Sequence, residues 1–339
     1  MSEEVRVALF GYGLAGRYFH APLIRLVDGL RVTTVVTRDA GRSAAAREDD
    51  PDVAVVADPG AVWARAGEHD LVVVASANRT HVTLARAALA AGLPVVVDKP
   101  LCRTPEEAAA LQREAAGRLT VFQNRRWDGD FLALRAAVEA GRIGTVHRFE
   151  SRFERWRVEP KGYWRESGDP EDLGGLLYDL GSHLADQALL LLGPVAEVRA
   201  EVRRVRPWAA VDDDAFVALR HESGAVSHLW MSSVAAEQGP RFRVLGTAGA
   251  WVSEGLDGQE DALRAGRSPY DVPPRHARLL AAADGDDLAE SSVDVTGGDW
   301  PAFYRGVPAW VRGEAPAPVA LDDVVATLRV LRSAAEQAG

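Results

Sequence analysis

The fold is decided by the stretch Val5-Arg6-Val7-Ala8-Leu9-Phe10-Gly11-Tyr12-Gly13-Leu14-Ala15-Gly16. An apolar run of strand length leads directly into a G-x-G-x-x-G pattern that opens a predicted helix. Such glycines allow a tight turn, close approach of the backbone to a pyrophosphate, and packing of helix against strand, and the helix start offers free N–H groups to the anion. A plain glycine turn is the alternative. Pro22 is expected to shorten or bend the helix.

Strand-like and helix-like segments alternate through the first third of the chain. Apolar runs at 32–37, 71–75, 94–97 and 119–122 are typical of buried strands. Residues 80–91 are predicted to form a helix with a glycine just past its end, and another helix is expected from Thr104-Pro105. This βαβ rhythm predicts a parallel sheet.

A second pattern begins after about residue 123. A hairpin is predicted for residues 215–231, a helix for 178–192 and a closing helix for 321–338, whereas 267–298 is rich in Pro, Asp, Gly and Ser and predicts an irregular connection. The domains expected are 1–122 and 123–339, with the terminal helix able to pack back on the first.

Composition narrows the class of protein. The net charge of −10 over 339 residues disfavours general attraction to nucleic acid or anionic membranes. Cys102 is the only cysteine, which excludes an internal disulfide, and no metal-ligand spacing is evident. The first residues do not resemble a secretion signal, and no apolar run has membrane-spanning length. We expect a cytoplasmic protein without a metal.

Asp98-Lys99-Pro100 follows the apolar run at 94–97 and is the most informative motif for function. Ligands of open α/β sheets bind outside the carboxyl ends of the strands, so an ammonium there is expected to face a site. Pro100 ends the strand and fixes the position of the lysine. The alternative is a surface lysine beside a strand end.

The end of the second strand bears on the choice of dinucleotide. NAD-binding versions usually carry an acidic residue about 20 residues beyond the glycines, whereas an arginine accommodates the 2′-phosphate of NADP. Here the strand ends in Thr37-Arg38-Asp39. A hydroxyl donor and a planar guanidinium favour NADP, and Asp39 keeps NAD as the alternative.

Two further motifs carry polar side chains. Asn78 and His81 follow the strand at 71–75 and are expected to border the nicotinamide, although Asn78 could instead only cap a helix. Asp179 and His183 are four residues apart, which places them on one face of a helix where they can act on one substrate. Either Asp179 or Asp186 would orient His183. A solvated Asp and His pair is the alternative.

Together these motifs resemble the glucose-fructose oxidoreductase, inositol dehydrogenase and rhizopine-catabolism (Gfo/Idh/MocA) family over nearly the whole chain. Asp98 stands where Glu is usual. Longer strings resemble the branch of NADP-dependent scyllo-inositol dehydrogenases, namely 19–23, 124–128, 164–165 and 257–261. Gln123 stands where that branch often has His.

The resemblance implies an α/β amino-terminal Rossmann domain and a carboxyl-terminal α+β domain with a large open antiparallel sheet, through which the chain would form a homodimer or homotetramer. The site would lie between the domains. In the implied mechanism His183 exchanges a proton with a ring hydroxyl, Lys99 stabilises the reacting oxygen, and Asp179 orients a hydroxyl or His183.

The resemblance also assigns residues to each ligand. Those expected at the cofactor are Gly11, Tyr12, Gly13, Leu14, Ala15, Gly16, Thr37, Arg38, Ala75, Asn78, His81, Asp98, Lys99, Trp164 and Arg165. Those expected at the substrate are Lys99, Asn124, Arg126, Tyr163, Asp179 and His183.

The function predicted from the sequence is that of an NAD(P)-dependent dehydrogenase, preferring NADP, that acts on the CH–OH group of a cyclic polyol or sugar. scyllo-Inositol is the first candidate. The alternatives are a reductase of another small carbonyl, such as a sugar ketone or a biliverdin-like acceptor, and a catalytically inactive dinucleotide-responsive regulator. Retention of Lys99, Asp179 and His183 speaks against the regulator, because a sensor needs only the cofactor half.

Overall fold

The computed structural model describes residues 4–157, 159, 160, 162, 166–283 and 287–338. The chain divides into two compact units, and each is made of separate stretches of sequence. Unit 1 consists of Met1–Asn124, Glu260–Ser268 and Trp300–Val325, and unit 2 of Arg125–Gln259, Pro269–Asp299 and Ala326–Gly339. The first unit is therefore completed by residues near the end of the chain.

Unit 1 contains a parallel sheet, as the βαβ rhythm predicts. Among the described residues its strand order is β3-β2-β1-β4-β5-β6, and every pairing is parallel. The order reverses at β1, which is the point where doubly wound sheets bind ligands. The strands are β1 (Val5–Phe10), β2 (Leu30–Val36), β3 (Ala54–Val56), β4 (Leu71–Val74), β5 (Val95–Asp98) and β6 (Leu119–Phe122).

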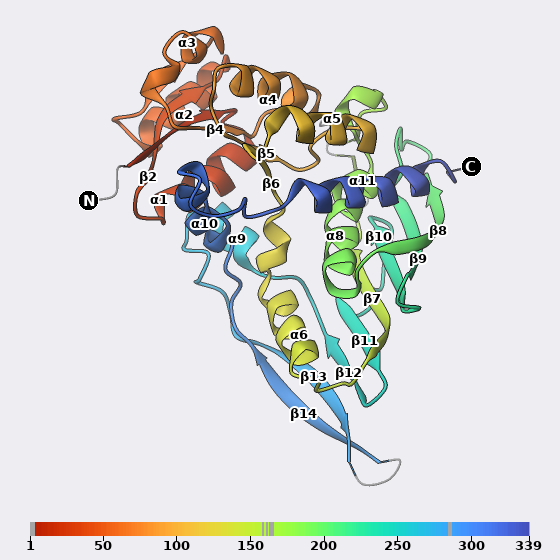
Figure 1. The fold of residues 1–339 in the computed structure, drawn as a ribbon. Helices are drawn as coiled ribbons and strands as arrows, with labels where there is room; N and C mark the ends of the chain where they lie inside the picture. The colour runs from red at the N-terminus through yellow and green to blue at the C-terminus, as the bar shows by residue number, and fades with distance from the viewer. Residues whose placement is uncertain (1–3, 158, 161, 163–165, 284–286, 339) are drawn as a thin grey trace. The chain divides into compact units, whose positions relative to one another are not determined.

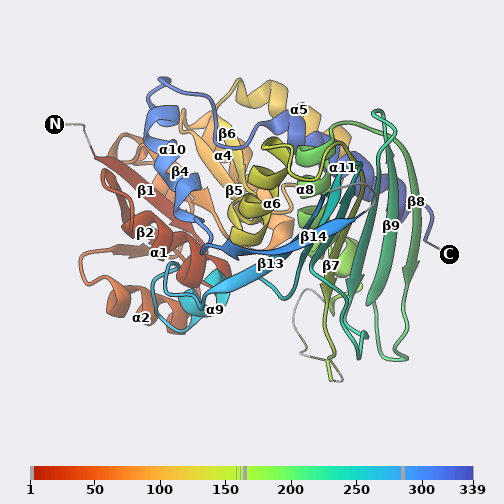
Figure 2. The same ribbon diagram turned by 90° about the horizontal axis from the view of Figure 1, so that it is seen from below.

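Helices cover both faces of this sheet. Helices α4 and α5 lie on one face and α1 and α10 on the other (Figures 1 and 2). Burial on both faces explains why β4 is entirely apolar and why all four of its residues are inaccessible to solvent. The helices with residues in unit 1 are α1 (Ala21–Arg25), α2 (Ala40–Asp49), α3 (Gly60–Trp63), α4 (His81–Ala90), α5 (Pro105–Ala115), α9 (Gln259–Arg264), α10 (Pro301–Val311) and the start of α11 (Leu321–Ala335).

Residues near the carboxyl end of the chain complete unit 1 through hydrogen bonds to its edge strand. The Thr120 hydroxyl donates to the Val319 carbonyl at 2.9 Å and accepts from the Val319 N–H at 3.2 Å. The Trp310 indole donates to the Gly117 carbonyl at 2.8 Å. The last strand of the sheet is therefore covered by a segment about 200 residues away in sequence.

Unit 2 contains a large and mostly antiparallel sheet, which confirms the predicted fold class. Among the described residues its order is β14-β13-β12-β11-β7-β10-β9-β8, and only β10 with β7 is parallel. The strands are β7 (Val146–Glu154), β8 (Val195–Arg203), β9 (Asp214–His221), β10 (Val226–Ser232), β11 (Phe242–Gly246), β12 (Gly249–Ser253), β13 (Arg275–Ala282) and β14 (Leu288–Val295).

One face of this sheet packs against helices and the other is open. Helices α6 (Gly129–Glu139) and α8 (Gly181–Leu192) lie along the same face (Figure 2). The opposite face carries half-buried side chains in neighbouring strands, with Phe216 5.1 Å from Trp230 between ring centroids and the Arg152 guanidinium 3.9 Å from the Trp230 centroid. Alternation of buried and half-buried residues along β9 and β10 follows from the two faces.

Two predictions about local structure were wrong. Residues 267–298 were predicted to be irregular, but they include the hairpin of β13 and β14. Most of β14 is exposed and polar, so no hydrophobic alternation marks it. The single helix predicted over 178–192 is divided at Leu180 into α7 (Leu176–Asp179) and α8.

Of the helices in the described part of the chain, none has both the length and the apolar character that crossing a bilayer requires.

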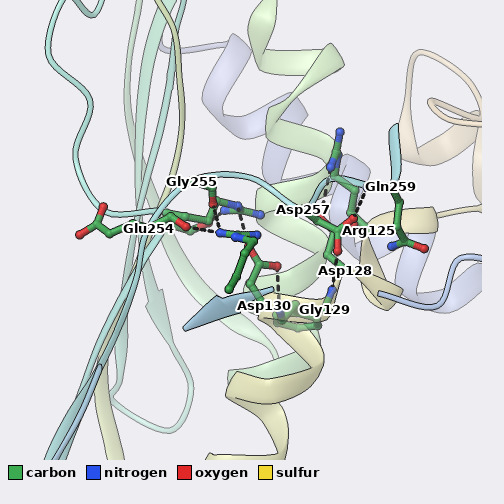
Figure 3. A network of polar contacts seen from close by, with 12 residues as sticks. Arg125, Asp128, Gly129, Asp130, Glu254, Gly255, Asp257 and Gln259 are labelled. Atoms are coloured by element: carbon green, nitrogen blue, oxygen red, sulfur yellow. Dashed lines mark hydrogen bonds and ion pairs between the residues drawn. The ribbon is translucent and has the colours of Figure 1, made fainter. Parts of the chain in front are cut away.

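A buried carboxylate fixes the start of α6 in unit 2. Asp257 accepts hydrogen bonds from the backbone N–H of Gly129 at 2.8 Å and of Gln259 at 2.9 Å (Figure 3). Gln259 in turn donates through its side chain to the Trp127 carbonyl at 3.2 Å. Within the string 257–261, Asp257 and Gln259 therefore have a structural role at the start of α6.

We expect Asp257→Ala to lower the free energy of unfolding by about 2 kcal/mol, because it leaves two buried N–H groups without their acceptor. Chemical denaturation measures the change. The matched control is Asp261→Ala, at an exposed position in α9, with an expected change of only a few tenths of a kcal/mol. Equal losses in the two variants would contradict the role given to Asp257.

Candidate functional site: a dinucleotide turn, a strand-end lysine and an acid–base helix

The glycine-rich turn after β1 has the backbone geometry that its sequence predicts. Gly11 has φ of +96°, and a Cβ there would lie 2.7 Å from the Ala75 carbonyl oxygen. A Cβ at Gly16 would collide with the Gly11 carbonyl. Both positions therefore require glycine, and the turns after β1 and β4 approach each other closely.

The helix after this turn is irregular, as Pro22 led us to expect. A π-type turn covers Gly16–His20, and the Ala21 N–H donates to the Gly16 carbonyl. Pro22, which has no N–H to donate, then lies in the first turn of α1. The π-type turn directs His20 into the interior, where its side chain is 0% exposed.

The Tyr12 side chain is buried and hydrogen-bonded to a carboxylate. Its hydroxyl donates to Asp49 at 3.0 Å, and Arg17 binds the same carboxylate through two nitrogens at 2.8 and 3.0 Å. Burial raises the pKa of Tyr12 to about 12, and the hydrogen bond to Asp49 adds to the effect. The side chain anchors the turn, so only its backbone is left to face a ligand.

The end of β2 exposes a cation and a carboxylate next to each other, Arg38 and Asp39. Asp39 caps α2, since it accepts from the Arg42 N–H at 2.8 Å. Arg38 is exposed. Arg42 lies next to the glycine turn, and its guanidinium carbon is 3.6 Å from where a Gly13 Cβ would stand. Arg42 is not among the cofactor residues predicted from the sequence, although its position four residues after Arg38 could have indicated it.

The segment after β4 is held to the segment after β5 by His81. The imidazole is 1% exposed, with Nδ1 2.8 Å from the Pro100 carbonyl and Nε2 3.2 Å from the Ser76 carbonyl. Burial lowers the pKa of His81. Asn78 and Ala75 are also buried at this rim.

Lys99 follows the last residue of β5, at the same rim as the glycine turn. The Asp98 carboxylate accepts from the Lys99 N–H at 2.8 Å. His20 Nε2 lies 4.0 Å from the same carboxylate oxygen, and His20 Nδ1 lies 2.6 Å from the Tyr304 hydroxyl. His20 and Tyr304 were absent from the predicted site. In the sequence, residues 19–23 stand out only as a string that resembles one branch.

The proposed acid–base residues lie in unit 2, at the junction of α7 and α8. Asp179 ends α7 and His183 is the third residue of α8; Leu180 between them keeps right-handed helical angles, with φ of −103° and ψ of −38°. His183 is 5% exposed and Asp179 is half-buried. The break at Leu180 therefore leaves the two residues about one helical turn apart.

Asp212 fixes the start of α7. Its carboxylate accepts from the Leu177 N–H at 2.8 Å, and its carbonyl accepts from the Leu176 N–H at 3.2 Å. Burial raises the pKa of Asp212 to about 6. Gly175 has φ of +94°, and a Cβ there would collide with this carboxylate.

Arg126 and Asp186 form a buried pair in unit 2. The guanidinium binds the carboxylate through two nitrogens, at 2.8 and 2.6 Å. The Asp186 carboxylate is thus held by the Arg126 guanidinium. Asn124 is 7% exposed and lies at the end of unit 1. Tyr163, Trp164 and Arg165 lie outside the described residues.

Each unit offers a distinct chemistry. The rim of unit 1 combines a glycine turn, the Arg42 guanidinium beside it, an exposed Arg38 at the end of β2 and an ammonium two strands away, which fits an extended dinucleotide with a phosphate. Unit 2 offers a histidine and a carboxylate, which can exchange a proton. In the described part of the chain, His, Cys, Asp and Glu form no cluster of three that could hold a metal ion.

Comparisons with known proteins agree with this division. Residues 5–124 match the family model of the oxidoreductase family with an NAD-binding Rossmann fold, and residues 131–252 match the GFO/IDH/MocA C-terminal domain. The chain is 35% identical to the oxidoreductase YdgJ of Escherichia coli, over 100% of this chain and 97% of that protein.

Two further comparisons extend over nearly full length. The chain is 32% identical to the scyllo-inositol 2-dehydrogenase (NADP(+)) IolW of Bacillus subtilis, over 98% of this chain and 94% of that one. The solved structure of the oxidoreductase YvaA from Bacillus subtilis superposes with a TM-score of 0.93 at 31% identity, over 99% of this chain and 97% of that one.

The buried His20 makes stability depend on pH. Burial lowers its pKa from 6.5 to about 4, so the folded chain binds fewer protons than the unfolded chain between these values. The free energy of unfolding therefore falls as pH drops through this window, by about 3 kcal/mol from this residue. We expect His20→Gln to reduce the drop in Tm between pH 7 and 4.5 by about 4 °C. An identical drop in both proteins would contradict this.

Proposed function

Because the chain belongs to the Gfo/Idh/MocA family of oxidoreductases, we propose that it is an NADP-preferring dehydrogenase that interconverts a ring hydroxyl and a ketone. Its substrate is a cyclic polyol or sugar, with scyllo-inositol as the first candidate. The support for this substrate is the likeness to IolW over nearly the full length of both chains.

Lys99 is the observation that carries the proposal. It is one of only two lysines in the chain, against 37 arginines, so arginine supplies nearly every other cation. A compact ammonium is a point charge with three donors, which suits a single developing oxyanion. Its place after β5 brings it to the rim that also bears the glycine turn.

The chain's own residues have separate roles in the proposed reaction. During oxidation, His183 accepts the hydroxyl proton while the carbon of that group gives up a hydride. Lys99 donates a hydrogen bond to the oxygen as charge develops, and Asp179 orients His183 or a neighbouring hydroxyl. The bound nicotinamide supplies the hydride acceptor. Reduction reverses each step.

The preference for NADP is supported by the end of β2. Arg38 is exposed and the Arg42 guanidinium lies beside Gly13, while one oxygen of the equally exposed Asp39 accepts the hydrogen bond that caps α2. Two guanidinium groups suit a 2′-phosphate, which presents three acceptor oxygens. Trp164 and Arg165 remain proposed cofactor contacts on the strength of the resemblance alone.

A homo-oligomer is also part of the proposal, through the open face of the sheet in unit 2. Phe216, Trp230 and Arg152 contribute a half-buried aromatic and cationic surface there. Aromatic residues and arginine are enriched in protein interfaces. Size-exclusion chromatography with light scattering distinguishes a dimer from a tetramer.

Initial rates test the catalytic proposal most directly. The purified protein is assayed with NADP and with NAD against inositol isomers and aldoses, and in the reverse direction against their ketones. Turnover of an inositol or sugar with NADP supports the proposal. Absence of turnover with every member of this panel, from neutral to alkaline pH, would contradict it.

Lys99→Met should lower kcat by roughly 100-fold or more, because the developing oxyanion loses its donor. Fluorescence titration should show unchanged affinity for NADPH, since the glycine turn is intact. The matched control is Arg103→Met, an exposed cation four residues further on, with unchanged turnover. Normal turnover in Lys99→Met would reject the role assigned to the lysine.

Arg38→Ala and Arg42→Ala should each raise the KM for NADP by about tenfold and leave the KM for NAD unchanged, because only NADP carries the 2′-phosphate. Arg47→Ala is the control, since Arg47 lies further along α2 and bonds Ser43 at 2.7 Å. Equal effects on both nucleotides would argue against recognition of the 2′-phosphate.

A further inference from the structure

A buried imidazole nitrogen beside Lys99 has no role in the reaction described above. His20 Nε2 is inaccessible to solvent and has no hydrogen-bond partner among the described residues. It lies 4.0 Å from an oxygen of Asp98. A polar atom in this state is costly unless its partner is close.

The other nitrogen of the ring determines where the proton lies. Nδ1 is 2.6 Å from the hydroxyl of Tyr304, which is itself 0% exposed. If Nδ1 carried the proton, the Nε2 lone pair would face the Asp98 carboxylate in a dry interior. If Tyr304 donates to Nδ1, the Nε2–H faces the carboxylate instead. The second arrangement is the favourable one.

The carboxylate that His20 faces also holds the backbone of Lys99. The Asp98 oxygen nearest His20 Nε2 is the one that accepts from the Lys99 N–H. On the other side of Lys99, the Pro100 carbonyl bonds His81. Two histidines therefore act on the backbone around Lys99. His81 contacts the Pro100 carbonyl directly, and His20 acts on the Lys99 N–H through Asp98.

Packing alone does not account for this polar pair. His20 and Tyr304 lie among aromatic rings, with Phe122 4.5 Å from His20 and Phe303 5.2 Å from Tyr304 between centroids. Apolar side chains would fill the same space without burying a hydroxyl and an imidazole. A buried hydroxyl and imidazole at this place point to an interaction with the carboxylate.

We propose that Tyr304 and His20 are positioning residues for Lys99, which they act on through Asp98. Tyr304 fixes the ring with its proton on Nε2, this N–H fixes the Asp98 carboxylate, and the carboxylate fixes the backbone from which the Lys99 ammonium extends. The catalytic use of Lys99 rests on the proposed function, whereas the geometry of Tyr304, His20 and Asp98 does not.

Hydrogen exchange of one amide tests the geometry without any turnover. Because the chain has only two lysines, ¹⁵N-lysine labelling gives a spectrum in which the Lys99 amide is readily followed, and ¹⁵N-threonine adds the Thr120 amide in β6 as an internal reference. Tyr304→Phe and His20→Leu should speed exchange of Lys99 by about tenfold and leave Thr120 within about twofold.

Two variants control for chemistry and packing. His20→Gln keeps an amide donor near the position of Nε2 and should restore most of the protection of Lys99. Tyr18→Phe removes a hydroxyl from the same π-type turn and should change nothing. Unchanged exchange of Lys99 in Tyr304→Phe would overturn the proposal, and so would equal acceleration of Lys99 and Thr120, which indicates only lost packing.

Kinetics test whether the effect passes through Asp98. Tyr304→Phe should lower kcat by about tenfold with the Kd for NADPH unchanged, and should have no further effect in an Asp98→Ala background. An equal loss of kcat in both backgrounds would overturn the route through Asp98. A wild-type protein that turns over no polyol would contradict the proposed function alone, because the exchange experiment still decides the positioning of Lys99.

Discussion

The parallel alignment of β1, β4 and β5 is the constraint on which the rest of unit 1 depends. Apart from Arg6 near the start of β1 and Asp98 at the end of β5, these strands are apolar and buried, so helices must cover both faces and polar groups gather near the strand ends. Because the strands run in one direction, their carboxyl ends lie at a common rim. The glycine turn, Asn78 and Lys99 share that rim for this reason.

Charged side chains have different roles in the two units. In unit 1 the arginines near the glycine turn are available to an anion, while Asp39 and Asp49 are engaged by a helix start and by Arg17. In unit 2 the carboxylates of Asp257, Asp212 and Asp186 bind backbone N–H groups or a guanidinium and so hold the structure.

The sequence predicts those parts of the fold that depend on local pattern. Glycine spacing, apolar runs and helix caps identify β1, β4, β5 and the start of α5, where Thr104 accepts from the Glu107 N–H as expected. Strand β14 could not be predicted because most of its residues are exposed. The break at Leu180 could not be predicted because the backbone angles of Leu180 stay close to helical. Arg42 is found only once the glycine turn and α2 are folded together.

The Tyr304 and His20 pair was unpredictable for another reason, since 284 residues separate its members.

The return of Trp300–Val325 to unit 1 has a consequence for how the protein is made. During synthesis, β6 emerges long before Val319 and Trp310, the partners of Thr120 and Gly117. Unit 1 therefore completes its folding only after Trp300–Val325 has left the ribosome, and a fragment that ends at residue 124 lacks part of its own interior.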